Sequence, residues 1–213
     1  MASRSSEAII LRTYQLRESD LIVSFLARDL GKLRGVARRA RKPGNRFGSG
    51  IERLSYVKLY YFHRENRDLD TLDSCEIIRS RFNLAGNYDL GVALDFFAEV
   101  SEHILPPAEP NERFFRLLVS VTDHLVEKRQ AALWPAVNYF TLWAVKLGGF
   151  LAPVRIDPED QALAEEILHT PIAKVAPREW SRQTVEPLRR QLIRLIEEHT
   201  ERKLVTAPYL QAL

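Results

Sequence analysis

The 213-residue sequence predicts an α+β protein of two domains, a small β-barrel over residues 1–80 and an all-α domain over residues 81–213. In the first 80 residues apolar and polar side chains alternate with a period of two, which is typical of half-buried strands. After residue 80 the period becomes 3.6, the repeat of helices with one apolar face. A composition of 46% hydrophobic and 28% charged residues is that of an ordinary globular protein.

Five short strands are predicted in the first domain, each bounded by a polar turn or a glycine. In the first strand the alternation puts Ile10 and Arg12 on one face, and in the fourth it puts Val57 and Tyr61 opposite Lys58. Strands this short leave unpaired edges unless the sheet closes, so we expect a closed or nearly closed barrel. The strands cover residues 7–16, 20–27, 31–37, 53–62 and 72–78.

Five amphipathic helices are predicted in the second domain. Asn111 and Asp157 are suitable N-caps, Pro158 suits a first helical position, and the pair Gly148-Gly149 ends the third helix. Each helix has one apolar stripe to bury, so the helices are expected to pack together. His199 falls on the apolar stripe of the last helix and is expected in the core. The helices cover residues 89–105, 111–125, 134–147, 157–168 and 185–204.

Charge is distributed unevenly along the chain. Residues 1–80 carry 16 Lys and Arg against 10 Asp and Glu, a net charge of +6, whereas the remaining residues carry 15 against 18, a net charge of −3. Residues 28–46 hold eight cations and one carboxylate, Asp29. A confined run of one sign predicts contact with a polyanion, and the alternative is a solvated loop that keeps the protein soluble.

Aromatic residues lie among these cations, as in grooves that bind single-stranded nucleic acid by phosphate contact and base stacking. Arg12 and Tyr14 share a strand face, Lys58 lies between Tyr56 and Tyr60, and Arg46 precedes Phe47. The alternative is that these rings belong to the barrel core. The candidate nucleic-acid contacts are Arg12, Lys32, Arg34, Arg38, Arg39, Arg41, Lys42, Arg46, Phe47, Lys58 and Tyr60.

No motif of catalysis or cofactor binding is recognisable. The glycines match neither phosphate-loop spacing, no nucleophile elbow occurs, and the five histidines are scattered singly. The single cysteine, Cys75, makes neither a disulfide nor a Cys-based zinc site. We therefore expect no enzyme activity, metal or cofactor. Without a signal peptide or an apolar run of ~18–20 residues, a cytoplasmic protein is expected.

The segment over residues 7–48 resembles the N-terminal region of the RecO family of bacterial recombination mediators. The matching pieces are Leu11-Arg12, Glu18-Ser19-Asp20, Gly31-Lys32 and Arg46-Phe47-Gly48. Residues 69–72 before Glu76, residues 140–150 and the tail over residues 198–213 are also similar to the family, with less specific motifs.

The resemblance implies an N-terminal OB-fold, a helical domain and binding of single- and double-stranded DNA. It also implies annealing of complementary strands without ATP, and help in exchanging single-strand-binding protein for recombinase. The implied partners are RecR and the acidic, Phe-ended C-terminal tail of the single-strand-binding protein. Many family members carry a four-Cys zinc cluster, which residues 151–175 lack here. Some carry Arg before the residue that matches Phe140, where this chain has Asn138 and Tyr139.

Two sites are candidates for a partner tail that needs both a cation and an apolar slot. One is Trp143 with Lys146; the other is Arg190 with Arg194 on the last helix. The alternative for these arginines is that they pair with Glu197 and Glu201 at helical spacing and offset the helix dipole. For the whole chain, the alternatives to a DNA-binding mediator are an RNA-binding OB-fold protein and a protein-interaction adaptor.

Overall fold

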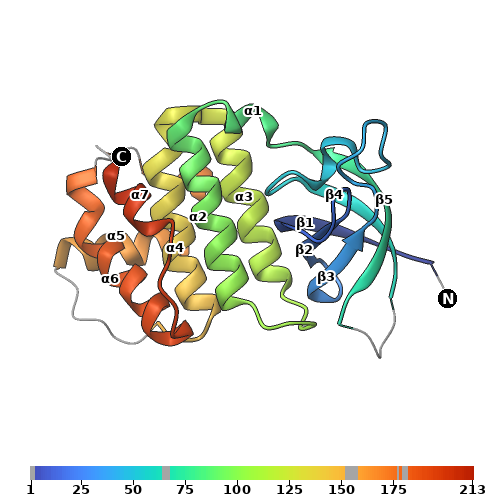
Figure 1. Cartoon of the computed structure of the whole chain (residues 1–213). Helices are drawn as coiled ribbons and strands as arrows, with labels where there is room; N and C mark the ends of the chain where they lie inside the picture. The colour runs from blue at the N-terminus through green and yellow to red at the C-terminus, as the bar shows by residue number, and fades with distance from the viewer. Residues whose placement is uncertain (1–2, 64–67, 152–157, 177, 179–181) are drawn as a thin grey trace. The chain divides into compact units, whose positions relative to one another are not determined.

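The computed structural model describes residues 3–63, 68–151, 158–176, 178 and 182–213. Contacts divide the chain into two compact units. The barrel unit comprises Met1–Asn83 and Leu105–Phe115; the helical unit comprises Leu84–Ile104 and Arg116–Leu213. Figure 1 shows the strands in the first and the long helices in the second, so the predicted α+β class is confirmed.

The barrel is closed in the order β1-β2-β3-β5-β4. All neighbouring strands are antiparallel except β3 and β5, which are parallel. Closure leaves no free sheet edge among these strands, which explains how such short strands are stable. The strands are β1 (Ser3–Gln15), β2 (Leu21–Ala27), β3 (Gly31–Ala37), β4 (Tyr56–Phe62) and β5 (Asp70–Arg79), and they match the five predicted strands.

A β-bulge in β1 changes which side chains point into the barrel. The pairing with β2 shifts between Ile10 and Arg12. Ile10 pairs with Phe25 and is buried in the core, whereas Arg12 pairs with Ser24 and is exposed. The expectation that Ile10 and Arg12 share one face is therefore wrong, because the extra residue at the bulge reverses the alternation.

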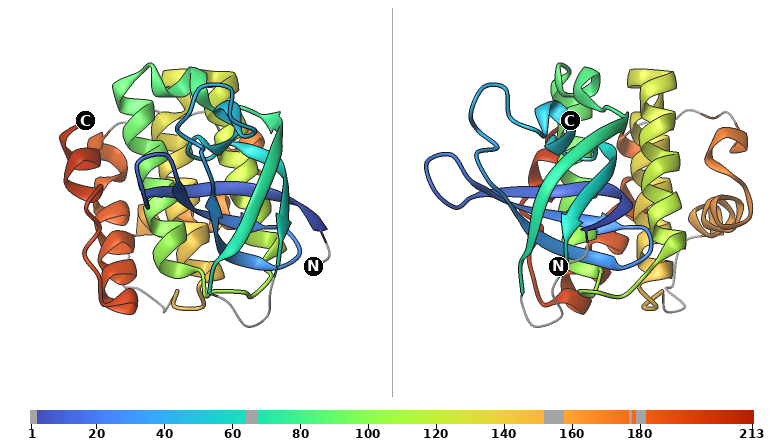
Figure 2. Two further views of the ribbon diagram at one scale, coloured as in Figure 1. Left: turned by 45° about the vertical axis from the view of Figure 1, so that its right-hand side comes forward. Right: turned by 90° about the vertical axis from the view of Figure 1, so that its right-hand side faces the viewer.

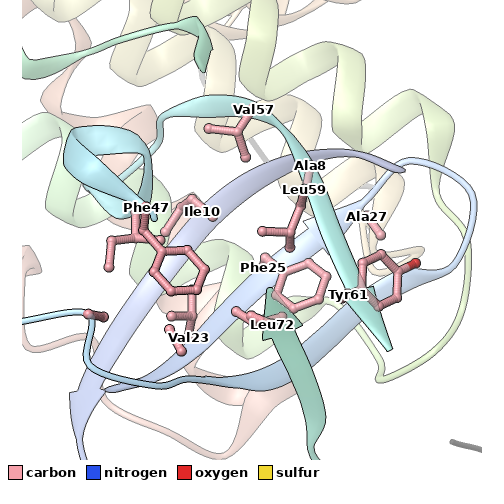
Figure 3. Close-up of a cluster of buried hydrophobic side chains, with 13 residues drawn as sticks. Ala8, Ile10, Val23, Phe25, Ala27, Phe47, Val57, Leu59, Tyr61 and Leu72 are labelled. Atoms are coloured by element: carbon pink, nitrogen blue, oxygen red, sulfur yellow. The ribbon is translucent and has the colours of Figure 1, made fainter. Parts of the chain in front are cut away.

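The barrel core consists of inward-facing side chains from all five strands, together with Ile51 and two residues from the loop after β3 (Figure 3). The Phe25 and Tyr61 rings meet edge to face, with centroids 5.9 Å apart. The two loop residues are Ala40 and Phe47, and Figure 3 shows the Phe47 ring close to Ile10 and Val23. The loop is thus fastened to the core at two points.

The segment Leu105–Phe115 returns to the barrel unit although α2 precedes it. Its Ala108 N–H donates to the Lys32 carbonyl at 2.9 Å. The Arg28 guanidinium pairs with Glu7 at 2.6 Å and with Glu112 at 2.8 Å. The Phe115 ring lies edge-on to Tyr56, with centroids 5.5 Å apart. The predicted division after residue 80 does not include this return segment in the barrel.

The helical unit is built around α4, which packs against α2, α5 and α6. Phe96 and Phe97 of α2 contact Phe140 of α4, with the rings of Phe97 and Phe140 only 4.4 Å apart. The helices are α1 (Phe82–Ala85), α2 (Tyr88–Ile104), α3 (Glu112–Lys128), α4 (Leu133–Leu147), α5 (Pro158–His169), α6 (Arg182–Thr200) and α7 (Ala207–Ala212), with 3-10 turns η1 (Gly48–Ile51), η2 (Arg129–Ala132) and η3 (Ile172–Lys174).

The helix ends follow the predicted capping signals where these are described. Asn111 Oδ1 accepts the Phe114 N–H at 2.9 Å, as expected of an N-cap, and α4 ends at Gly148. The predicted cap Asp157 lies outside the described residues. His199 is exposed and stacks on Phe150, with ring centroids 4.0 Å apart, so its expected place in the core is wrong. The short helices α1 and α7 were not predicted.

Candidate nucleic-acid interface

A basic patch lies on the outer face of β1, β2 and β3, directly beyond the bulge. Arg12, Ser24 and Arg34 form one cross-strand row, and Tyr14 belongs to the next row. The guanidinium of Arg12 lies 5.3 Å from the centre of the Tyr14 ring, and that of Arg34 lies 5.9 Å from it. The outer patch, Arg12, Tyr14 and Arg34, thus combines two cations with a half-buried ring.

The loop over residues 38–47, here called the basic loop, is tied to the turn between β1 and β2. Asp20 Oδ1 accepts the Arg39 N–H at 2.8 Å, and the Ser19 carbonyl accepts the Arg41 N–H at 3.1 Å. The Arg41 side chain also donates to the Glu18 carbonyl at 3.3 Å. Figure 2 shows in its right-hand view that the turn and the loop project on the same side of the barrel.

Asn45 orders the other end of the basic loop. Its side-chain amide donates to the Lys42 carbonyl at 3.0 Å, and its Oδ1 accepts the N–H groups of Phe47 and Gly48 at 2.8 and 2.9 Å. Together with the buried Ala40 and Phe47, these bonds give the loop a defined backbone. A loop held in this way presents its charges in fixed positions, which lowers the entropy cost of binding.

Most cations of the basic loop and outer patch have no acidic partner. Among the residues that the structure describes, no carboxylate forms an ion pair with Arg12, Arg38, Arg39, Arg41 or Lys42. The side chains of all five are exposed. Unpaired and exposed cations keep their full charge available for phosphate groups, whereas a cation in an ion pair is partly neutralised.

An open cleft of about 670 Å³ adjoins the outer patch. The row that contains Tyr14 continues through Ile22 and Val36 to Thr71, and Val36 and Thr71 line the cleft. OB-folds bind oligonucleotides at the face of their second and third strands and at the adjoining loops, which is where this cleft lies. Its lining residues are Leu16, Arg17, Asp20, Val36, Arg38, Asp68, Leu69, Asp70 and Thr71.

Three predicted contacts differ from the others in their surroundings. Phe47 is only 4% exposed and packs in the barrel core, which corrects the expectation that its ring is offered to DNA. Lys32 is half-buried at the end of β3 remote from the basic loop, where its backbone pairs with Pro107. Arg46 is exposed but forms an ion pair with Asp73 at 2.8 Å.

Lys58 and Tyr60 lie on a different outer face, formed by β1, β4 and β5. Lys58 pairs across the strands with Glu7 and Glu76, and the Tyr60 hydroxyl donates to Glu76 at 3.0 Å. The Lys58 ammonium lies 5.4 Å from the Tyr60 ring centre. Glu7 and Glu76 flank Lys58 on the neighbouring strands, so this face lacks the one-signed charge of the basic loop.

Sequence reasoning noted Tyr14 beside Arg12 without including it among the candidate contacts, and it did not select Arg17, Asp20 or Asn45. Tyr14 shares the outer patch, Arg17 lines the cleft, and Asp20 and Asn45 hold the basic loop. The available signal for Asp20 was its place in the Glu18-Ser19-Asp20 turn beside a basic run. The candidate contacts were cations and aromatic rings, so the carboxylate of Asp20 was not among them.

The two candidate sites for a partner tail also differ. The Lys146 ammonium lies 4.9 Å from the Trp143 ring centre, and the Trp143 indole donates to the Ile167 carbonyl at 3.2 Å. Arg190 and Arg194 instead form ion pairs one helical turn away, with Glu186 at 2.6 Å and with Glu198 at 2.7 Å. Arg190 and Arg194 thus pair at helical spacing, as the alternative expects, but with Glu186 and Glu198 in place of Glu197 and Glu201. Lys146 and Trp143 instead combine a cation and a ring.

Metal-binding clusters and membrane-spanning helices are both absent from the part of the chain that the structure describes. Within the described ranges, no group of three or more His, Cys, Asp or Glu side chains is arranged to hold a metal ion. Among the described helices, none is long and apolar enough to cross a membrane. The interface features on the barrel unit are therefore the strongest basis for a function.

Comparison with known proteins identifies the family of this chain. Residues 1–81 match the family model described as "Recombination protein O N terminal". The chain is 36% identical to the DNA repair protein RecO of Koribacter versatilis, with 99% of each chain covered. It is 33% identical to the RecO protein of Cutibacterium acnes over 55% of this chain and 48% of the relative. The similarity extends through both units, and the chain belongs to the RecO family of DNA repair proteins.

Proposed function

We propose that this protein is a DNA-binding recombination mediator that binds single- and double-stranded DNA through the barrel unit. Membership of the RecO family supports a role in recombinational repair. Binding is assigned to the outer patch, the cleft and the unpaired cations of the basic loop. The protein anneals complementary strands without ATP and, with RecR, helps to replace single-strand-binding protein with recombinase.

The observation that carries the proposal is the position of the unpaired cations Arg38, Arg39, Arg41 and Lys42 beside the Arg12–Tyr14–Arg34 patch. Phosphates bind the cations and release counterions, while a base stacks on the half-buried ring of Tyr14. This combination of cations and a ring suits a flexible single strand, whose bases are free to turn toward the barrel. Duplex DNA would use the phosphate contacts alone.

Annealing is tested with two complementary fluorescent oligonucleotides in the absence of ATP, comparing wild type with the variant Arg38→Ala/Arg39→Ala/Arg41→Ala/Lys42→Ala. We expect the variant to bind a single-stranded oligonucleotide at least ~10-fold more weakly and to anneal more slowly. The log–log salt dependence of its affinity should flatten by about 3, at ~0.7 per lost phosphate contact. Thermal melting should change little, because these side chains are solvated.

The matched control removes four cations from the helical unit, in the variant Arg190→Ala/Arg194→Ala/Arg202→Ala/Lys203→Ala. Its net charge equals that of the loop variant, so a general electrostatic effect would weaken both equally. A loop variant that binds and anneals like wild type, while folding normally, would show that the basic loop is not the DNA-binding element. A matched RNA oligonucleotide that binds more tightly than DNA would favour the RNA-binding alternative, since the 2′-hydroxyl is the main difference.

The acidic, Phe-ended tail of single-strand-binding protein is proposed to dock at Trp143 and Lys146. The exposed ammonium would pair with the tail carboxylates, and the half-buried indole would contact the terminal ring. A labelled acidic peptide ending in Phe is titrated against wild type, Lys146→Glu, and Arg190→Glu/Arg194→Glu. Loss of binding only in Lys146→Glu supports this site, whereas loss only in the double variant moves the tail to α6.

A further inference from the structure

We propose that Asp20, a negatively charged residue in the DNA-binding cleft, increases DNA affinity because it positions the basic loop. The inference rests on the proposed function of that loop. It assigns Asp20 as a positioning residue, one that acts through Arg39 and its neighbours and makes no contact with DNA itself. A carboxylate beside phosphates would otherwise be expected to weaken binding by charge repulsion.

The geometry connects Asp20 to the start of the basic loop. Its Oδ1 accepts the Arg39 N–H at 2.8 Å and lies 3.4 Å from the Ser19 hydroxyl. The Asp20 backbone carbonyl accepts the N–H groups of Leu16 and Arg17 at 3.1 and 3.4 Å, which closes the turn between β1 and β2. Asp20 therefore joins the two segments: its side chain bonds to the basic loop, and its backbone closes the turn between β1 and β2.

The bond matters because Arg39 has an unusual backbone conformation. Its φ is +57°, in the left-handed region that residues with a side chain seldom adopt without support from their surroundings. The Arg39 carbonyl in turn accepts the Lys42 N–H at 3.0 Å and closes a turn over residues 39–42. The charge-assisted hydrogen bond that Asp20 accepts favours this conformation, and the loop cations around it are exposed.

Without the carboxylate acceptor, the left-handed conformation at Arg39 loses its side-chain support. The cations remain in the sequence but sample more arrangements, and DNA must then order them at an entropic cost. A bond to the backbone N–H needs an acceptor oxygen but no charge. The effect of the acceptor and the effect of the charge can therefore be separated by substitution.

The experiment measures affinity for a single-stranded oligonucleotide, and its salt dependence, in three variants. Asp20→Ala removes acceptor and charge and is expected to bind about fivefold more weakly, with a salt slope smaller by at least the ~0.7 of one phosphate contact. Asp20→Asn keeps an acceptor oxygen and removes the charge, and is expected to bind at least as tightly as wild type. Asp20→Leu keeps the side-chain volume without an acceptor and should follow the Ala variant.

The matched control is Asp68→Ala. Asp68 lines the same cleft and is exposed, and none of its described contacts reaches the basic loop. Its removal changes the net charge by the same amount as Asp20→Ala but leaves the loop supported, so binding should tighten. Opposite effects of the two substitutions would distinguish positioning from electrostatic repulsion, and melting curves of both variants check that the barrel is folded.

The background of the loop variant Arg38→Ala/Arg39→Ala/Arg41→Ala/Lys42→Ala provides the decisive comparison. There Asp20→Ala should no longer weaken binding, because the four unpaired loop cations that Asp20 positions are gone. If Asp20→Ala tightens binding in the wild-type background as Asp68→Ala does, the positioning role is overturned although the proposed function stands. If the loop variant itself binds like wild type, the proposed function fails first.

Discussion

Phe47 fixes the basic loop from inside the barrel, so its contribution is to stability rather than to base stacking. Its ring is 4% exposed and lies beside Ile10 and Val23 in the core. Phe47→Ala would leave a cavity and should reduce the free energy of unfolding by about 3–5 kcal/mol. Urea denaturation measures this loss. Phe47→Leu, which keeps most of the volume, should cost much less, and an equal loss in both variants would contradict the cavity explanation.

Glu99 makes a comparable contribution in the helical unit. It is 6% exposed, and its carboxylate accepts the N–H groups of Val205 and Thr206, both at 2.8 Å, and the Thr206 hydroxyl at 2.5 Å. These bonds hold the connection that leads into α7. Glu99→Ala would remove the acceptor of three part-buried donors, at a cost of about 1–3 kcal/mol for each donor that water does not reach. Thermal melting should fall clearly, and an unchanged melting temperature would show that water replaces the carboxylate.

At the scale of residues, the sequence identifies the cations but not their ion pairs or their burial. The basic character of residues 38–42 follows directly from the sequence, but ion pairing depends on distant residues such as Asp73, the partner of Arg46. Phe47 was selected because a ring beside Arg46 looks like a stacking pair. Its burial depends on the return of the loop to the core, which local composition does not encode.

At the scale of elements, the return segment Leu105–Phe115 depends on a close approach at Gly31. A Cβ on Gly31 would lie 2.1 Å from the Glu109 carbonyl oxygen, and the φ of Gly31 is +77°. Gly31→Ala therefore combines backbone strain with a clash and should destabilise the barrel unit by more than ~1 kcal/mol. Gly44→Ala is the matched control, because its φ is +69° with nothing within 4 Å. Equal losses in urea denaturation would show that the close approach is unimportant.

The return segment is also held by Glu7, Arg28 and Tyr56, and the stabilisation that Glu7 contributes depends on pH. A hydrogen bond from Tyr56 and the neighbouring Arg28 lower the pKa of Glu7 below its usual 4.5. Glu7 therefore stabilises the fold fully above about pH 4.5, and this contribution is lost as the pH falls through its lowered folded-state pKa. Glu7→Gln should melt below wild type at pH 7, and the difference should shrink in acid. A difference independent of pH would contradict this assignment.

The strands and long helices could be predicted from periodicity, because each element buries one face. The bulge in β1 could not, since Ile10 and Arg12 fit an uninterrupted alternation equally well and only the pairing with β2 reveals the extra residue. The return of Leu105–Phe115 to the barrel was also missed. It depends on contacts with Arg28, Gly31 and Tyr56, which precede that segment by some 50 to 80 positions in the sequence.

At the scale of the whole molecule, the distribution of charge agrees with the proposal that the barrel unit binds DNA. The excess of cations in residues 1–80 belongs to the barrel, whereas Arg190 and Arg194 of α6 form ion pairs with Glu186 and Glu198. A one-signed field concentrated on one unit guides a polyanion to that unit. Association with DNA should therefore slow as salt rises in the wild type, and much less in the loop variant.

The whole chain is also expected to fold without zinc, although the family resemblance implies a four-Cys cluster in many members. The single cysteine, Cys75, lies half-buried in β5, and burial raises the pKa of its thiol to about 11. A thiol that stays protonated at neutral pH is a poor zinc ligand, and one cysteine does not complete a four-ligand set. In the helical unit, the packing of Phe96, Phe97 and Phe140 provides an apolar core of its own.

Elemental analysis should give less than one zinc per chain, and a chelator should leave the melting temperature unchanged. A stoichiometric zinc signal, with melting lowered by the chelator, would mean that histidines and carboxylates replace the cysteines and that the core does not stabilise the helices alone.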